Sequence, residues 1–103
     1  MFLRVLDVHE DGQVQSVADG ILRITDPGLT DGVPGEVYLG PVGHRFAAGH
    51  RIRLLVSSGA HPYYNRNLGN GDPTGTATQI LRAHQGVVVG GENGLRIHLP
   101  LAR

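Results

Sequence analysis

Apolar and polar residues alternate along the middle of the chain, in residues 50–57. Ile52, Leu54 and Val56 are apolar and point one way, whereas Arg51, Arg53 and Ser57 are polar and point the other way. Successive side chains of a strand point to opposite faces, so this pattern predicts a strand with one face in a core and one toward solvent. A glycine turn at Gly49 precedes the strand, and a loop beginning at Gly59 follows it.

Further segments on both sides have the composition of short strands, and they are residues 2–9, 13–25, 36–39, 87–89 and 95–99. Residues 13–25 fit either two strands or one bent strand, and residues 77–82 fit a strand or a helix. Turn signals lie at Asp11-Gly12 and Asn93-Gly94. Many short strands and no predicted helix indicate an all-β fold, an antiparallel jelly roll or β-sandwich.

Length and charge narrow the class of protein. The 103 residues suffice for one small core, so a single domain over residues 1–103 is expected. Nine basic residues, all arginine, balance nine acids, which argues against a nucleic-acid partner. Without cysteine, neither disulfides nor thiolate metal sites can form. No signal peptide or membrane span is evident, so a cytoplasmic protein without a membrane partner is expected.

The serines do not have the pattern of a hydrolase nucleophile. That nucleophile sits in Gly-x-Ser-x-Gly, because it must lie on a tight turn between a strand and a helix. Ser16, Ser57 and Ser58 are the serines of this chain, and none has that frame. We interpret Ser57 and Ser58 as the structural end of a strand, and no residue is predicted to be catalytic.

Six histidines raise the question of a metal site. Two histidines two apart on one strand would point to the same side, but the chain has no His-x-His. His44 and His50 are separated by Gly49 and the residues before it, so a shared ion would require a sharp bend. We expect no metal and no cofactor, and instead a hydrogen bond from His44 or His50 that fixes the turn between two strands.

Residues 59–75 form a long polar loop, and a loop of that length is either functional or packed by its own side chains. Tyr63 and Tyr64 could stack on a sugar or another flat ligand, because tyrosine has an apolar face and a polar tip. Alternatively, one of them covers the open end of the sandwich. We prefer the interpretation that one of the two tyrosines covers the open end of the sandwich.

Residues 43–58, GHRFAAGHRIRLLVSS, and the loop HPYYNRN that follows resemble the C-terminal domain of cocaine esterase and X-prolyl dipeptidyl-peptidase type hydrolases. The early segment DVHEDG and the later PGEVY match the same family. The structural motif of this resemblance consists of His44, Phe46, Gly49, His50, Arg51, Arg53, Ser57 and Ser58. The resemblance covers nearly the whole chain.

The resemblance implies a jelly-roll domain of the galactose-binding-like type, attached to a serine α/β-hydrolase domain that carries the catalytic residues. The family contains esterases, α-amino-acid ester hydrolases and X-prolyl peptidases. This chain is therefore expected to be a non-catalytic accessory domain whose partner is an α/β-hydrolase catalytic domain, on the same or a separate chain. The candidate binding residues lie in the loop and are Tyr63, Tyr64, Arg66 and Asn67. In the same loop, His61, Tyr63 and Asn65 replace the family's Phe, Arg and Asp.

Members of this family enter the region through additional upstream strands, so the sheet is expected to lack one or more N-terminal strands. An uncovered sheet edge offers unpaired N–H and C=O groups to another strand. The prediction is therefore that the chain forms a homodimer by edge pairing or strand exchange, or else that it is a fragment of a longer protein. The alternative function is that of a free-standing β-sandwich module that binds a carbohydrate or a protein partner.

Overall fold

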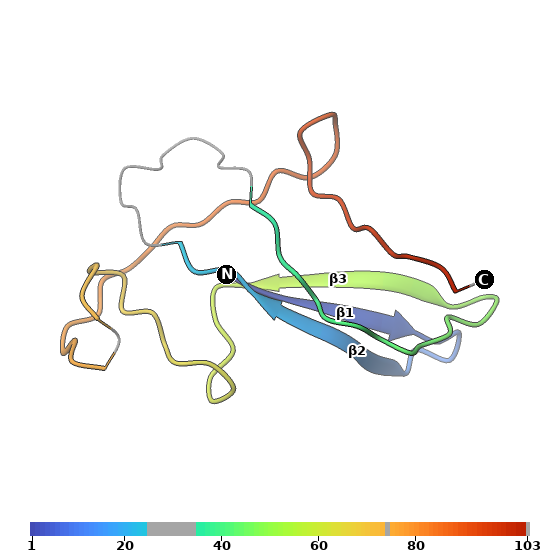
Figure 1. Ribbon diagram of the computed structural model, residues 1–103, viewed down its shortest axis with the longest axis horizontal. Coiled ribbons are helices and arrows are strands. Elements are labelled where there is room, and N and C mark those ends of the chain that lie inside the picture. The colour runs from blue at the N-terminus through green and yellow to red at the C-terminus, as the bar shows by residue number, and fades with distance from the viewer. Residues whose placement is uncertain (25–34, 74, 103) are drawn as a thin grey trace.

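The computed structural model describes residues 1–24, 35–73 and 75–102 (Figure 1). Its regular structure is one antiparallel sheet of three strands, β1 (Phe2–Val8), β2 (Val14–Ile21) and β3 (Arg51–Ser57), in the order β2-β1-β3. Because these ranges contain strands and no helix, the all-β prediction is confirmed. It follows that nothing in the described ranges has the length and apolar character of a membrane-spanning helix.

β1 and β2 form a hairpin at the predicted Asp-Gly turn. Gly12 has φ 86°, in the left-handed region that glycine adopts without strain. The backbone N–H of His9 donates to the Gln13 carbonyl at 2.8 Å, and the Gln13 N–H donates to Asp11 Oδ1 at 2.9 Å. The hairpin therefore begins where the turn signal placed it.

The sequence of residues 13–25 fitted either two strands or one bent strand, and the structure has one bent strand, β2. It is a single strand with an irregularity, since Val5 faces Ala18 while the next residue of β1, Leu6, faces Ser16. The extra residue, Val17, bends β2 locally, as a β-bulge does. Residues 22–24 have no regular structure, and residue 25 lies outside the described residues.

β3 is the alternating segment of the sequence, and it pairs with the other side of β1, where Val5 lies opposite Leu54. Its predicted apolar face is only partly covered. Leu54 and Val56 are half-buried, but Ile52 is 49% exposed. The strand prediction is confirmed, whereas the buried face is incomplete.

The core lies on β1, the central strand. Residues of both parities are buried there, as expected for a strand covered on both faces, and they are Phe2, Leu3, Val5, Leu6 and Asp7. The Cα radius of gyration is 16.0 Å, against about 13 Å for a compact domain of this length. Long irregular segments surround a small sheet, so the packed part is narrow.

Residues 36–39 were expected to form a strand, and this prediction is wrong: they pack on the sheet without joining its ladder. The contact lies at Gly20 of β2, which is buried. A Cβ atom at Gly20 would lie 2.5 Å from Val37 Cγ1 and 2.9 Å from Leu39 Cδ2. Glycine is therefore required at this position by the close approach of a second segment.

The predictions of strands at residues 87–89 and 95–99 are also wrong, because these residues have no regular structure. One backbone hydrogen bond links the two segments, from the Leu95 N–H to the Val88 carbonyl at 2.8 Å. Val89 is 81% exposed. Residues 77–82 likewise form neither strand nor helix. β-Branched residues favour an extended backbone, but a strand also needs a neighbouring strand to pair with. Within the described ranges, none of these three segments pairs with a strand.

Candidate functional site

The centre of the candidate site is the carboxylate of Asp7, near the end of β1. Its side chain is 2% exposed. His44 Nε2 lies 2.8 Å from Asp7 Oδ2, and His50 Nδ1 lies 2.9 Å from Asp7 Oδ1. Each carboxylate oxygen therefore has an imidazole partner, which offsets the cost of burying the charge. We use the name Asp7 cluster for Asp7, His9, His44 and His50.

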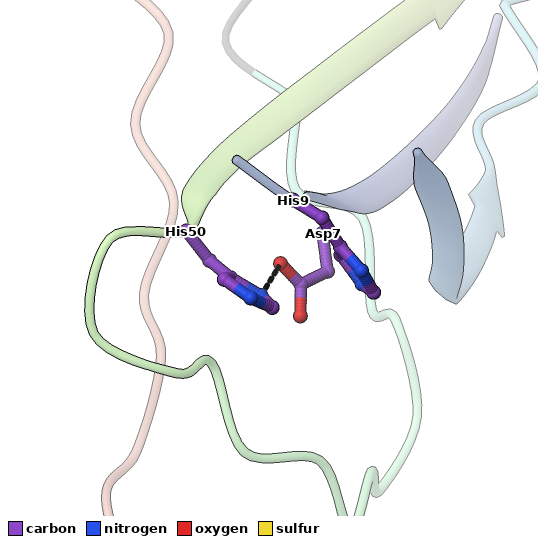
Figure 2. A group of neighbouring side chains, drawn as sticks. All are labelled: Asp7, His9 and His50. Atoms are coloured by element: carbon purple, nitrogen blue, oxygen red, sulfur yellow. Dashed lines mark hydrogen bonds and ion pairs between the residues drawn. The ribbon is translucent and has the colours of Figure 1, made fainter. Parts of the chain in front are cut away.

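His9 and His50 complete the cluster on the sheet side. His9 comes two residues after Asp7, and this spacing places both side chains on the same side of an extended chain. His50 comes directly before β3, whose first residue, Arg51, faces Val8. The His9 and His50 rings stack with centroids 4.3 Å apart and an interplanar angle of 26°. Figure 2 shows the Asp7 carboxylate beside these two rings, with its hydrogen bond to His50 drawn as a dashed line.

The turn before β3 positions His50. The His50 N–H donates to the Ala47 carbonyl at 3.1 Å, and Gly49 has φ 85°. A Cβ atom at Gly49 would also collide with the carboxylate of Glu10. Glu10 is exposed and can move away, so Gly49 is favoured chiefly by its left-handed backbone.

His44 reaches Asp7 from the segment before this turn. Its ring lies edge-on to Phe46, with centroids 4.8 Å apart and an interplanar angle of 78°. This arrangement is a favourable one for aromatic rings and limits the orientation of the imidazole. Phe46 therefore supports the His44 side of the Asp7 cluster.

The Asp7 carboxyl has a pKa below its ordinary value. Burial is the largest single influence and raises the pKa, whereas the hydrogen bonds from His44 and His50 lower it. The charges of the His50 and His9 imidazoles lower it further. Asp7 is thus held as a carboxylate.

The rest of the sequence motif lies outside this cluster. Arg51 and Arg53 are exposed on β3. The Ser57 hydroxyl donates to the Gly59 carbonyl at 2.9 Å, at the end of the strand. Ser57 and Ser58 also line an open hollow of about 340 Å³ beside Met1. The structure therefore separates the histidines of the motif from its serines.

The four candidate binding residues of the loop do not converge on one pocket. Tyr64 packs on Phe2 with ring centroids 5.9 Å apart, whereas Tyr63 is 78% exposed and Arg66 is exposed. Asn67 Oδ1 accepts a hydrogen bond from the Gly69 N–H at 2.9 Å. Tyr64 and Asn67 border a hollow of only about 30 Å³. A hollow this small does not enclose a sugar.

Sequence reasoning did not identify Asp7 and His9 as site residues. The available signal was the Asp-x-His spacing of residues 7–9, which places two possible ligands on one side of a strand. The search for His-x-His was too narrow to find it. The third member, His50, comes from the other end of a long connection, and only the β1–β3 pairing brings it there.

Comparisons with known proteins agree with the resemblance seen in the sequence. Residues 1–98 match the family of the X-Pro dipeptidyl-peptidase C-terminal non-catalytic domain. The chain is also 30% identical over 100 residues to cocaine esterase from Rhodococcus sp. (strain MB1 Bresler), a match that covers 81% of this chain and 17% of that enzyme. No solved structure matches this chain. The chain therefore belongs to the family of X-Pro dipeptidyl-peptidase C-terminal non-catalytic domains.

Proposed function

We propose that this domain is the accessory part of a serine hydrolase and packs on an α/β-hydrolase catalytic domain that cleaves acyl esters or X-prolyl peptides. The observation that carries the proposal is the match of residues 1–98 to a domain described as non-catalytic. The chain spans 17% of the length of the cocaine esterase it resembles, and most of such an enzyme therefore lies outside the matched part. The substrate class is taken from the names of these relatives.

Exposed apolar side chains on the sheet support the proposal that the sheet packs on the catalytic domain. Ile52 and Leu55, on opposite faces of β3, are 49% and 39% exposed, and Val14 of β2 is 50% exposed. Burying apolar surface of this kind favours association by about 25 cal/mol per Å². We propose that the β3 side of the sheet and the loop carrying Tyr63, Tyr64, Arg66 and Asn67 contact the catalytic domain.

The second candidate function is that of a free-standing binding module. It is favoured by one observation, the 78% exposure of Tyr63. An exposed tyrosine ring can stack on the apolar face of a sugar while its hydroxyl hydrogen-bonds. In this case Tyr63→Ala abolishes binding to a glycan panel and leaves the fold intact. Binding of no glycan by the wild-type chain removes this candidate.

Without its catalytic domain, the chain is proposed to form a homodimer along β3. In the part of the chain that is described, β3 pairs with β1 on one side only. Its other edge therefore offers N–H and C=O groups to a second copy. A cytoplasmic location stays a prediction from the sequence.

The test of the proposed function is to identify the serine that reacts. The native protein is captured with an antibody against this domain and treated with a fluorophosphonate probe. Ester and X-prolyl p-nitroanilide hydrolysis are measured in parallel. The label is expected on a polypeptide segment outside residues 1–103, together with one of the two activities.

Labelling of Ser16, Ser57 or Ser58, abolished by Ser→Ala at the labelled position, would contradict the proposal. So would the absence of any labelled hydrolase in the captured material. Because this chain has no lysine, contacts with the catalytic domain are mapped by carboxyl-directed cross-linking rather than by amine reagents. Cross-links are expected from acids near β3 and the loop, with Asp72 as the nearest acid of the loop.

A further inference from the structure

We propose that Asp7, His9 and His50 form a binding site for a divalent transition-metal ion, for which zinc is the probe. One ligand atom from each of the three residues lies within 4.8 Å of the others. All three side chains come from the same end of the β1–β3 pair (Figure 2). The inference is independent of the proposed function.

The distances suit a single ion after a small movement. Zinc binds imidazole nitrogen and carboxylate oxygen at about 2.0–2.2 Å, so two ligands of a tetrahedral ion lie about 3.4 Å apart. His50 Nδ1 and Asp7 Oδ1 are 2.9 Å apart. His9 is partly exposed, and its ring would have to leave the stacked arrangement with His50 to direct a nitrogen lone pair at the ion. Rotation of the His9 side chain would bring its ligating nitrogen closer to the Asp7 oxygen and the His50 nitrogen.

The chemistry of the three ligand atoms determines which metal ions suit the site. Two imidazole nitrogens and one carboxylate oxygen suit zinc, cobalt and nickel, whereas calcium and magnesium prefer sites made of oxygen. Three protein ligands leave a fourth position for water or for a residue of a docked partner. The site is thus expected to bind zinc with one exchangeable ligand.

His44 supports the carboxylate from the other side. It lies 2.8 Å from Asp7 Oδ2 and leaves Oδ1 directed at His50. Ligating carboxylates in metal sites are commonly held by such an outer hydrogen bond, which fixes their orientation. His44 is accordingly a positioning residue and not a ligand.

The competing explanation is a purely structural His–Asp–His network that holds the turn before β3. The two explanations differ at His9. Among the hydrogen bonds between described residues, none uses the His9 imidazole, which only stacks on His50. When the ion binds, it occupies the position between His50 Nδ1 and Asp7 Oδ1, and the His50 proton is carried by Nε2. A metal needs His9, while a hydrogen-bonded network does not.

The experiment is a calorimetric titration of Zn²⁺ into the chelator-treated, tag-free chain. One zinc ion per chain is expected, with micromolar or tighter affinity and a rise in Tm on binding. His9→Gln is expected to weaken binding at least about tenfold. It should leave the far-UV circular dichroism of the metal-free chain unchanged. His84→Gln, an exposed histidine outside the cluster, is the matched control and should bind zinc as the wild type does.

Side-chain NMR of the wild type makes the test independent of the variants. Zinc should shift the imidazole resonances of His9 and His50 together and leave those of His84 and His98 in place. The proposal is overturned if wild-type zinc binding is weaker than millimolar, if His9→Gln binds zinc as tightly as the wild type, or if the shifts fall on other histidines.

Discussion

Arg4 of β1 and Asp19 of β2 form a two-point ion pair across the hairpin. Arg4 Nε donates to Asp19 Oδ1 at 2.6 Å and Arg4 Nη2 donates to Asp19 Oδ2 at 2.7 Å. The two residues are direct partners in the strand register. Such parallel hydrogen bonds have defined geometry, so the pair helps to set the pairing of β1 with β2.

This pair predicts a dependence of stability on pH in the acid range. The hydrogen bonds from Arg4 lower the pKa of the Asp19 carboxyl, against a smaller opposing effect of burial. A lowered pKa in the folded state contributes stability that is present above the unfolded value, about 3.9, and is lost as the pH falls through the folded value. Asp19→Asn should therefore lower the Tm by roughly 2–4 °C at pH 7, since exposed pairs are weak.

The measurement is the Tm difference between wild type and Asp19→Asn at several pH values from 7 to 2. The difference should shrink as the pH falls below 3.9 and should decrease in high salt. Glu36→Gln, which removes an exposed carboxylate outside the sheet, serves as the control and should change little at any pH. A difference that stays constant down to pH 2 contradicts the assignment.

Asp7→Asn is expected to destabilise the domain more than any other single carboxylate replacement. Asparagine keeps the shape but has one amide donor, which would face an imidazole that also donates. A buried group then loses its partner, and charge-assisted hydrogen bonds are lost as well. The expected drop in Tm is at least about 10 °C.

Thermal unfolding followed by circular dichroism measures this effect. Asp72→Asn, in the exposed loop, is the comparison and should shift the Tm by less than about 2 °C. Equal shifts for the two variants would show that the Asp7 contacts contribute nothing particular to the fold.

Leu6→Ala tests the position of the core on β1. Leu6 is 8% exposed, and removing a buried leucine side chain usually costs about 2–5 kcal/mol. Leu81→Ala, at a residue that is 55% exposed, should cost less than about 0.5 kcal/mol. Urea unfolding gives both values. A cost at Leu81 as large as that at Leu6 would place the core elsewhere.

Gly20→Ala tests the contact between β2 and residues 37–39. The new Cβ would overlap Val37 Cγ1 and Leu39 Cδ2, and overpacking of this kind costs about 1–3 kcal/mol. Gly43→Ala is the control, because a Cβ there meets nothing within 4 Å. In the double variant, Val37→Ala should recover part of the loss. If Gly20→Ala is as mild as Gly43→Ala, this packing does not form in solution.

Self-association along β3 is measured by sedimentation equilibrium of the isolated chain. A monomer–dimer equilibrium is expected, and Leu55→Lys should shift it to the monomer, because charge on an edge strand opposes pairing. The same substitution at Val14 of β2 distinguishes the two edges and should leave the dimer intact. A wild-type monomer at millimolar concentration contradicts the proposed dimer.

The sheet was predictable where its signals are local. The alternation of residues 50–57, the apolar run of residues 2–9 and the Asp11-Gly12 turn each depend on neighbours in sequence, and all three correspond to the observed elements. Residues 87–89 have a similar composition and form no strand. What separates them from β3 is a partner strand, which composition does not encode.

The candidate site was predictable only in part for a related reason. His44 and His50 were recognised as residues that hold a turn, but their common partner, Asp7, lies on another strand. The sequence alone does not distinguish a buried aspartate from an aspartate on the surface. Its position in the central strand is a property of the sheet order, and so is the meeting of His9 with His50.

The order β2-β1-β3 also determines how fast different parts of the fold can assemble. β1 and β2 are joined by a short turn, whereas β3 must find β1 across residues 22–50. Closing the longer loop costs more entropy and is slower, so the hairpin is expected to form first and β3 to dock last. The Asp7 carboxylate is then expected to stay in contact with water until β3 docks and His44 and His50 reach it. Substitutions in the hairpin should slow refolding, while those in β3 and at His50 should mainly speed unfolding.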